Sequence, residues 1–226
     1  MSTPMHVQPD HLVVVCASLE QGRAWCARTL GAEPQAGGRH EWMGTHNLLL
    51  DLSSEAHAQV YLELIAIDPE APAPARPRWF GMDEPGLQAL VAVEPQLVAW
   101  VGRSPQVDMH RWGFITVGLQ AGPIVPCSRT RADGSVLRWQ IVVREDGRRL
   151  LDGAVPVLIQ WQREHPCDRL APGTVQLTEL VVRGLPQRAV DVMRVRGLSR
   201  PGDAGAALSV RLQSPLGERV LVSQVW

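Results

Sequence analysis

The chain has 226 residues, of which 45% are hydrophobic and 20% charged, and its formal net charge is −1. This length suffices for one large domain or two small modules, and the composition is ordinary for a globular protein. A charge balance this close to zero argues against a nucleic-acid partner, because binding a phosphate backbone usually requires a basic face. The apolar run at residues 12–17 is far too short to span a bilayer, so we expect a cytoplasmic protein without a membrane partner. The four cysteines include no C-x-x-C pair, which argues against a zinc ribbon or a disulfide framework.

The first seventy residues follow the order strand, helix and three strands. Residues 10–16 are an apolar, valine-rich run of strand length. Ser18 is a favourable N-cap for the helix that follows, and Gly31 stands where a helix commonly ends. The glycine-rich segment 37–43 is expected as a loop or irregular strand, and two further strands are expected near 45–52 and 60–67.

The strand at 60–67 carries one carboxylate among apolar neighbours, in the sequence Tyr61-Leu62-Glu63-Leu64-Ile65. Side chains alternate between the two faces of a strand, so Tyr61, Glu63 and Ile65 share one face. Burying an unpaired carboxylate is costly. Glu63 is therefore expected to meet a cation, a metal or a hydrogen-bonding ligand.

A second unit with the same order of elements is expected over residues 87–168, after a Pro/Ala-rich linker at 69–86 that serves as an extended spacer. Two apolar runs compete for its first strand, 90–93 and 97–101. The second is favoured, because Ser104-Pro105 then opens a helix with proline at its first position.

Turn signals divide the rest of this second unit. Asp-Gly pairs begin at residues 133, 146 and 152, and they bracket strands at 136–143 and 155–161. With the first unit at 1–68, the chain contains an internal repeat at a spacing of roughly 85 to 90 residues.

Residues 169–226 form a third, shorter unit with the order β-α-β-β. A strand is expected at 175–182, a helix at 186–195, and a hairpin from 207–213 and 219–225. We expect this extension to pack on the first two units and to cover a sheet edge.

Four motifs occur in a recognisable order. The first is the segment that runs from Gly37-Gly38-Arg39-His40 to Gly44-Thr45-His46-Asn47, and the second is the strand at 61–65. The third and fourth are the segments 129–139 and 156–166 in the second half of the chain. Together they resemble the glyoxalase-like domain family of the vicinal-oxygen-chelate (glyoxalase/bleomycin resistance/dioxygenase) superfamily. The resemblance implies an α+β fold in which tandem βαβββ modules form a curved, cup-like mixed β-sheet with flanking helices, with residues 169–226 packed on the same domain.

Metal enzymes of this superfamily hold a divalent cation with a His or Gln from the first strand and a Glu from the last strand of each module. Carried over by resemblance, the first-module ligands are His11 and Glu63, which suit Zn, Ni, Fe or Mn. In the second module Leu97 aligns with His11 and cannot bind a metal, while Gln160 stands where a Glu is expected. The metal site predicted from His11, Glu63 and Gln160 is therefore incomplete.

The motifs supply further candidate site residues. His46 is expected to assist Glu63 in catalysis, although as a loop histidine it can equally serve a structural role. The expected ligand-binding residues are His40, Asn47, Arg131, Trp139 and Trp161. For Arg131 a solvated position on a hairpin, and for the two tryptophans a place in the core, are equally open.

Functions of different classes remain open at this stage. One is an enzyme of the lyase, isomerase or dioxygenase type acting on a small oxygen-bearing metabolite, such as an α-hydroxy or α-keto compound. The alternative is a non-catalytic protein that binds or sequesters a small molecule, and a third is a structural dimer whose pocket has decayed. A homodimer is expected, because modules of this type pair through sheet edges. The absence of a G-x-S-x-G nucleophile elbow argues against covalent hydrolase chemistry.

Overall fold

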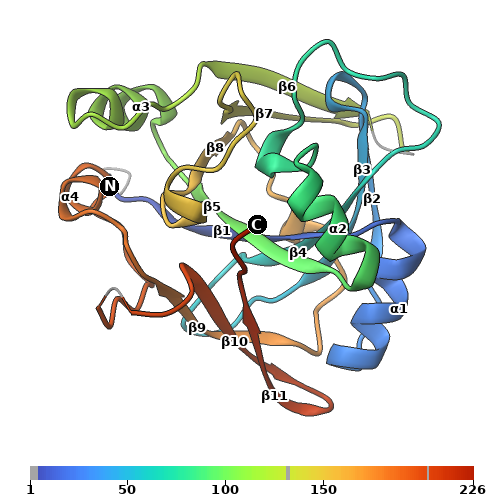
Figure 1. The fold of residues 1–226 in the computed structure, drawn as a ribbon. Coiled ribbons are helices and arrows are strands. Elements are labelled where there is room, and N and C mark those ends of the chain that lie inside the picture. The colour runs from blue at the N-terminus through green and yellow to red at the C-terminus, as the bar shows by residue number, and fades with distance from the viewer. Residues whose placement is uncertain (1–4, 131–132, 203) are drawn as a thin grey trace.

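The computed structural model describes residues 5–130, 133–202 and 204–226. It confirms the two consecutive β-α-β-β-β units and the β-α-β-β extension (Figure 1). The first unit comprises β1 (Gln8–Val15), α1 (Leu19–Leu30), β2 (Gln35–His40), β3 (Thr45–Asp51) and β4 (Tyr61–Ile67). The second comprises β5 (Gln96–Arg103), α3 (Val107–Thr116), β6 (Ile124–Thr130), β7 (Val136–Val142) and β8 (Val157–Trp161), with α2 (Pro85–Val93) between the two units. The extension comprises β9 (Gln176–Val182), α4 (Gln187–Met193), β10 (Leu208–Ser214) and β11 (Gly217–Val222).

One curled, eight-stranded sheet joins the two units, in the order β2-β3-β4-β1-β5-β8-β7-β6. Within each unit the first and last strands are parallel, β1 with β4 and β5 with β8, and the two first strands pair antiparallel at the centre. The two halves are therefore related by an approximate two-fold axis through the β1–β5 pair. The expected curved mixed sheet is confirmed.

The helix boundaries follow local chemistry, with one difference from the prediction. The Ser18 side chain accepts a hydrogen bond from the Gln21 N–H, and Gly31 ends α1 in the left-handed conformation at φ 64°. α3 begins at Val107 rather than at Pro105, because the Ser104 hydroxyl accepts from the Gln106 N–H and so closes a turn first. In the part of the chain that the structure describes, no helix is both long and apolar enough to cross a membrane.

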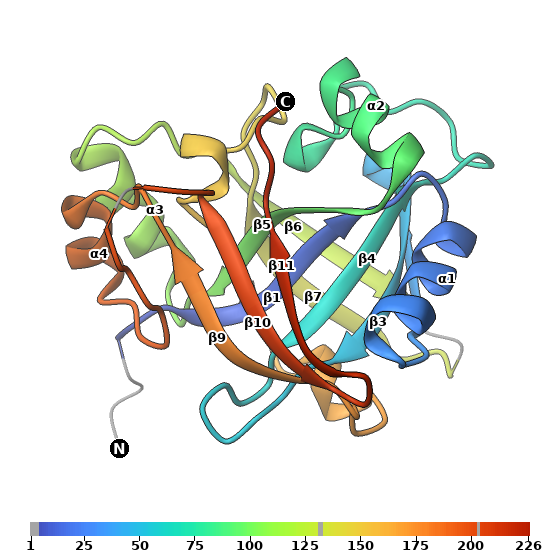
Figure 2. The same ribbon diagram turned by 60° about the horizontal axis from the view of Figure 1, so that its bottom comes forward.

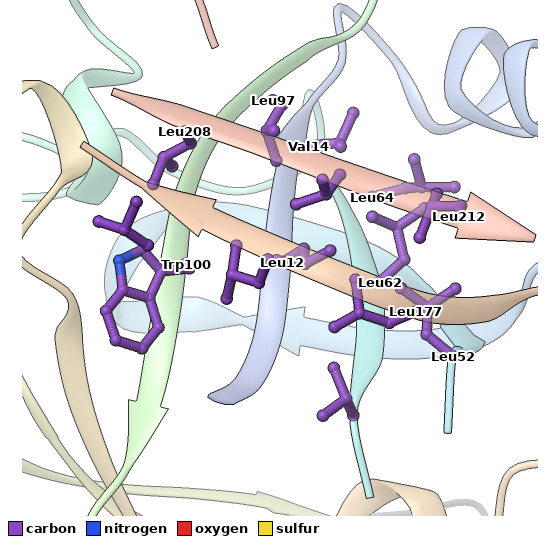
Figure 3. Close-up of a cluster of buried hydrophobic side chains, with 14 of the residues drawn as sticks. Leu12, Val14, Leu52, Leu62, Leu64, Leu97, Trp100, Leu177, Leu208 and Leu212 are labelled. Carbon is purple, nitrogen blue, oxygen red and sulfur yellow. The ribbon is translucent and has the colours of Figure 1, made fainter. Parts of the chain in front are cut away.

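The larger hydrophobic core lies on the convex face of the eight-stranded sheet. Leucine, valine and tryptophan side chains from β1, β4 and β5 meet leucines of β9 and β10 there, and all of them are nearly or completely buried (Figure 3). Alternation along the strands explains the set, since Leu12 and Val14 face this core while His11 and Val13 face the other side. α1 completes the face through Trp25 and Leu30.

The three-stranded sheet β11-β10-β9 covers that convex face and not a sheet edge (Figure 2). The prediction of an edge cover was wrong. The alternating leucines and valines of β9 and β10 give this sheet one apolar face, and two such faces packed together remove more surface from water than an edge contact can.

The concave face is filled at one end by the segment that the sequence suggested was only a spacer. Trp79, Phe80 and Met82 are buried there together with Leu87 and Val91 of α2, packed against the valines at the end of β1. The apolar run at 90–93, weighed above as a strand, is therefore the last turn of α2. The other end of the concave face, around the first half of β1, remains available for a pocket.

Candidate functional site

A pocket lies at this end of the concave face, and the space not filled by atoms there, open solvent at its mouth included, is about 440 Å³. Apart from Arg129 of β6, its polar side chains come from the first module, and its aromatic wall comes mainly from β7, β8 and the Trp79–Phe80 turn. The lining side chains include His11, His40, Asn47, Tyr61, Glu63, Trp79, Arg129, Trp139 and Trp161. Strand alternation selects them, because each lies on the face opposite the leucine core.

Glu63 has the hydrogen-bonding partner that its buried position requires. The Asn47 side-chain amide on the neighbouring strand β3 donates to Glu63 Oε1. The Asn47 oxygen in turn accepts from the Gly38 N–H at 2.8 Å. The Gly38 hydrogen bond fixes the orientation of the Asn47 amide. Glu63 Oε1 is therefore already hydrogen-bonded, and Oε2 is the carboxylate oxygen that faces the pocket.

His11 lies between two carboxylates. Its Nδ1 is 2.6 Å from Asp10 Oδ1, and its Nε2 is 3.5 Å from Glu63 Oε2. Since a carboxylate can only accept, the Nδ1–H donates to Asp10, and Nε2 is the nitrogen presented to Glu63. The ring stacks on Tyr61 with 4.6 Å between centroids, which holds its plane.

Asp10 is the buried anchor of the site, and the sequence analysis did not identify it. Its second oxygen accepts from Trp161 Nε1 at 2.9 Å and from His165 Nε2 at 3.1 Å. Burial alone would raise the pKa of Asp10, but the hydrogen bonds and charges of His11 and His165 outweigh it and hold the pKa well below the usual range. His165 Nδ1 accepts from the Cys167 N–H, so both of its nitrogens are used.

His40 lines the pocket as a neutral group. Burial, followed by the charges of Arg129 and His11, lowers its pKa to about 4 against the opposing effect of Glu63. Its Nδ1 lies 3.1 Å from the Thr45 hydroxyl, and Trp79 meets the ring edge-on at 4.9 Å between centroids. His40 is thus placed to exchange hydrogen bonds and not to carry charge at neutral pH.

Two of the residues predicted for the site do not join this group. His46 alternates with Asn47 and lies on the opposite face of β3, where its Nδ1 is 3.9 Å from Asp68. Gln160 alternates with Trp161, and its side-chain oxygen accepts from the Val107 N–H at the start of α3. Arg131 lies outside the described residues.

The glycine pair of the first motif makes room for side chains of the site. A Cβ at Gly37 would overlap the Asn47 side chain, and a Cβ at Gly38 would overlap the Arg129 stem on β6. Neither Gly37 nor Gly38 has a positive φ, unlike Gly44 at φ 58°, so this pair is needed for space and not for a special backbone conformation. Arg129, two residues before the predicted Arg131, therefore reaches the pocket.

The donor set does not fit a metal centre built from both modules. β1 and β5 begin at residues 8 and 96, and α1 and α3 at 19 and 107, so both pairs are offset by 88 residues. The counterpart of His11 is therefore Ala99, and the strand registers make Val157 the counterpart of Glu63. Leu97, aligned with His11 from sequence, lies in the convex core. Neither counterpart can bind a metal, and among the described residues no three His, Cys, Asp or Glu side chains are grouped as metal ligands.

The sequence matches the family described as "Glyoxalase-like domain" over residues 10–193. The chain belongs to this glyoxalase-like domain family. The matched region contains both modules and every side chain of the pocket named above. A fold and a family name do not by themselves fix a reaction, so the activity of this glyoxalase-like protein must be argued from its own site.

Of three similar solved structures, the first supports the fold. A hypothetical protein from Staphylococcus aureus superimposes with a TM-score of 0.60 at 11% identity, covering 96% of this chain and 86% of that one. Methylmalonyl-CoA epimerase from Mycobacterium tuberculosis gives a TM-score of 0.41 at 13% identity, covering 75% of this chain and 97% of that one. The corresponding Streptomyces coelicolor epimerase gives 0.42 at 14% identity, with 69% and 96% covered. Comparison with curated proteins gives no significant match.

Proposed function

We propose that this glyoxalase-like protein binds a small carbonyl-bearing metabolite in its cup and moves a proton on it, as an isomerase does. The observation that carries the proposal is the 3.5 Å approach of His11 Nε2 to Glu63 Oε2 on the pocket wall. The far side of each group is already committed, His11 to Asp10 and Glu63 to Asn47. His11 Nε2 and Glu63 Oε2 are therefore the two atoms that can contact a substrate.

The chemistry is general acid–base catalysis. Glu63 Oε2 takes a proton from the carbon next to the substrate carbonyl, and the C–H electron pair moves into the carbonyl group. The His11 imidazolium gives its Nε2 proton to the carbonyl oxygen, so an enol forms while Glu63 becomes protonated and His11 neutral. The Asp10 carboxylate stabilises the imidazolium before the transfer. The enol O–H proton then returns to His11 Nε2 while Glu63 gives its proton to a carbon of the enol, at another atom or on another face, which completes the isomerisation and restores both groups.

The pocket walls suit such a step. Trp139 and Trp161 lie 5.5 Å apart between ring centroids, and Phe80 and Ile159 add further apolar surface. An apolar, water-poor wall strengthens hydrogen bonds and proton transfer at the polar floor. This arrangement needs no metal, in keeping with the Ala99 and Val157 counterparts.

The test is exchange of carbon-bound hydrogen with solvent deuterium, followed by proton NMR. The probes are two 2-oxo acids, 2-oxobutanoate and 4-methyl-2-oxopentanoate, and two neutral carbonyl compounds, acetoin and dihydroxyacetone. We expect protein-dependent exchange on at least one probe, undiminished by EDTA. Replacing Glu63→Gln removes the base and should slow exchange by about 10²-fold or more.

The matched control is Glu55→Gln, which changes an exposed carboxylate and should leave the exchange rate unchanged. Exchange that survives Glu63→Gln, or that is lost equally in Glu55→Gln, contradicts the proposal. Ligand binding without exchange on any probe would establish the binding-protein alternative instead.

A further inference from the structure

The pocket contains an arginine that the proton-transfer step does not use. Arg129 lies on β6 opposite Leu137, on the same face as Trp139, and it lines both the pocket and the open groove between β2 and β6. Among the described residues that line the pocket, it is the side chain that stays cationic at every physiological pH. Its charge also acts inside the site, since it contributes to the low pKa of His40.

The first motif is shaped around this arginine. A Cβ at Gly38 would overlap Arg129 Cδ and would lie 2.6 Å from Nη1 and 2.8 Å from Nε. The guanidinium stem therefore lies directly against the β2 backbone. The Gly38 N–H on that same backbone donates to Asn47, which holds Glu63. One glycine thus positions both the cation and the proposed base.

We propose that the pocket is built for a small carboxylate, held by the Arg129 guanidinium so that the adjoining carbonyl group reaches His11 and Glu63. For the role of Glu63, this inference rests on the proposed function. A guanidinium offers two parallel N–H groups that match the two oxygens of a carboxylate. The ligand is thus a 2-oxo monocarboxylate whose alkyl chain lies on the tryptophan wall.

A phosphate ester is a poorer fit for the same arginine. Phosphate carries close to two negative charges at neutral pH and would lie in the same small pocket as the Glu63 carboxylate. A monoanion meets less repulsion there. The exposed Arg39 and Arg169 in the outer groove pair with carboxylates of the protein, which reduces the net positive charge that a phosphate dianion would meet there.

Binding, measured by isothermal titration calorimetry, tests the inference without any turnover. Pyruvate, 2-oxobutanoate and 4-methyl-2-oxopentanoate are each compared with their primary amides, which keep the shape and remove the charge. We expect at least one acid to bind about tenfold to a hundredfold tighter than its amide, the range of a charge-assisted hydrogen-bond pair. Equal affinity of acid and amide throughout the series, no binding of any acid, or tighter binding of inorganic phosphate would each overturn the inference.

Two variants assign that preference to the arginine. Arg129→Gln should abolish the preference for the acid and leave the amide unaffected, while Arg129→Lys should retain part of it. The control is Arg188→Gln, an exposed arginine on α4, which should change neither affinity. If Arg129→Gln unfolds, a reduced preference in the milder Arg129→Lys carries the test, and an unchanged preference there refutes it.

The inference and the proposed function can fail separately. Glu63→Gln removes the base while keeping Arg129, so its acid-over-amide preference should persist although deuterium exchange stops. Absence of exchange with an Arg129-dependent preference overturns only the proposed function. Exchange on acetoin or dihydroxyacetone without any preference for acids overturns only the carboxylate inference.

Discussion

Replacing Asp10 by asparagine is the sharpest test of how the site is held together. The carboxylate accepts three hydrogen bonds in a fully buried position, from His11, His165 and Trp161. A hydrogen bond to a charged group contributes about 1.5–3 kcal/mol, and one between neutral groups about 0.5–1.5 kcal/mol. Losing the charge at all three bonds should therefore lower the free energy of unfolding by about 3 kcal/mol.

The same substitution should also remove one of the two ring protons of the His11 imidazolium. Asparagine has one acceptor oxygen, which Trp161 and His165 together require, so its amide N–H₂ must face His11 Nδ1. Because a donor there needs an acceptor, His11 should lose its Nδ1 proton and become the neutral Nε2–H form. Nε2, the nitrogen presented to Glu63, would then carry the single proton of the ring.

Urea unfolding and ¹⁵N NMR of labelled histidines measure these two effects. Asp108→Asn, which changes an exposed residue in the first turn of α3, is the control and should cost less than about 0.5 kcal/mol. Because the native pKa of Asp10 is held low, its contribution is present above the unfolded pKa of about 3.9 and is lost as the pH falls through the native value. A decrease in the free energy of unfolding of less than about 0.5 kcal/mol at pH 7, or a His11 ring that keeps its Nδ1 proton, would refute the reasoning.

Three further predictions concern stability. Burial holds the His40 pKa at about 4, so wild-type stability should fall by up to about 3 kcal/mol as the pH drops from about 6.5 to 4; urea melts of His40→Gln should lack that slope. Leu64→Ala should cost about 2–5 kcal/mol in the convex core, whereas Val93→Ala, at a side chain 85% exposed, should be nearly neutral in the same melts. Gly22→Ala places a Cβ 2.8 Å from Cys16 Sγ, so it should lower the free energy of unfolding by about 1–2 kcal/mol despite alanine's helix propensity. Adding Cys16→Ala should restore most of this loss, whereas losses that simply add would contradict a clash between the two side chains.

The fold was largely predictable because its signals are local. Strand alternation, the Ser18 cap, the Gly31 stop and the Asp-Gly turns each depend on a few neighbouring residues. The resemblance then supplied how the units combine. The position of the β9–β11 sheet was not predicted, because an apolar strand face indicates that it is buried without indicating which other surface buries it.

The site was predictable only where one strand face defines it. Alternation placed Glu63 with Tyr61, and the motifs and the resemblance pointed to His11, Asn47 and the two tryptophans. The structure brings all of them to the lining of one pocket. The partner of Asp10 at His165 is 155 residues away in sequence, and no local pattern connects them. The sequence offered one signal for Asp10, since it is an acidic residue directly before the apolar part of a strand. A carboxylate among apolar neighbours was also the signal that identified Glu63.

Because both halves of the sheet around β1 and β5 belong to one chain, this protein is not subject to a constraint that applies to symmetric assemblies. In a two-fold homodimer every side chain of one half recurs in the other, so a catalytic pair and its surroundings must be compatible with their own copies. Joining both halves in one polypeptide lets each position diverge. Here one half supplies His11 and Glu63, while the other supplies Trp139, Trp161 and Arg129. Two similar halves of one sheet therefore have different roles in a single pocket.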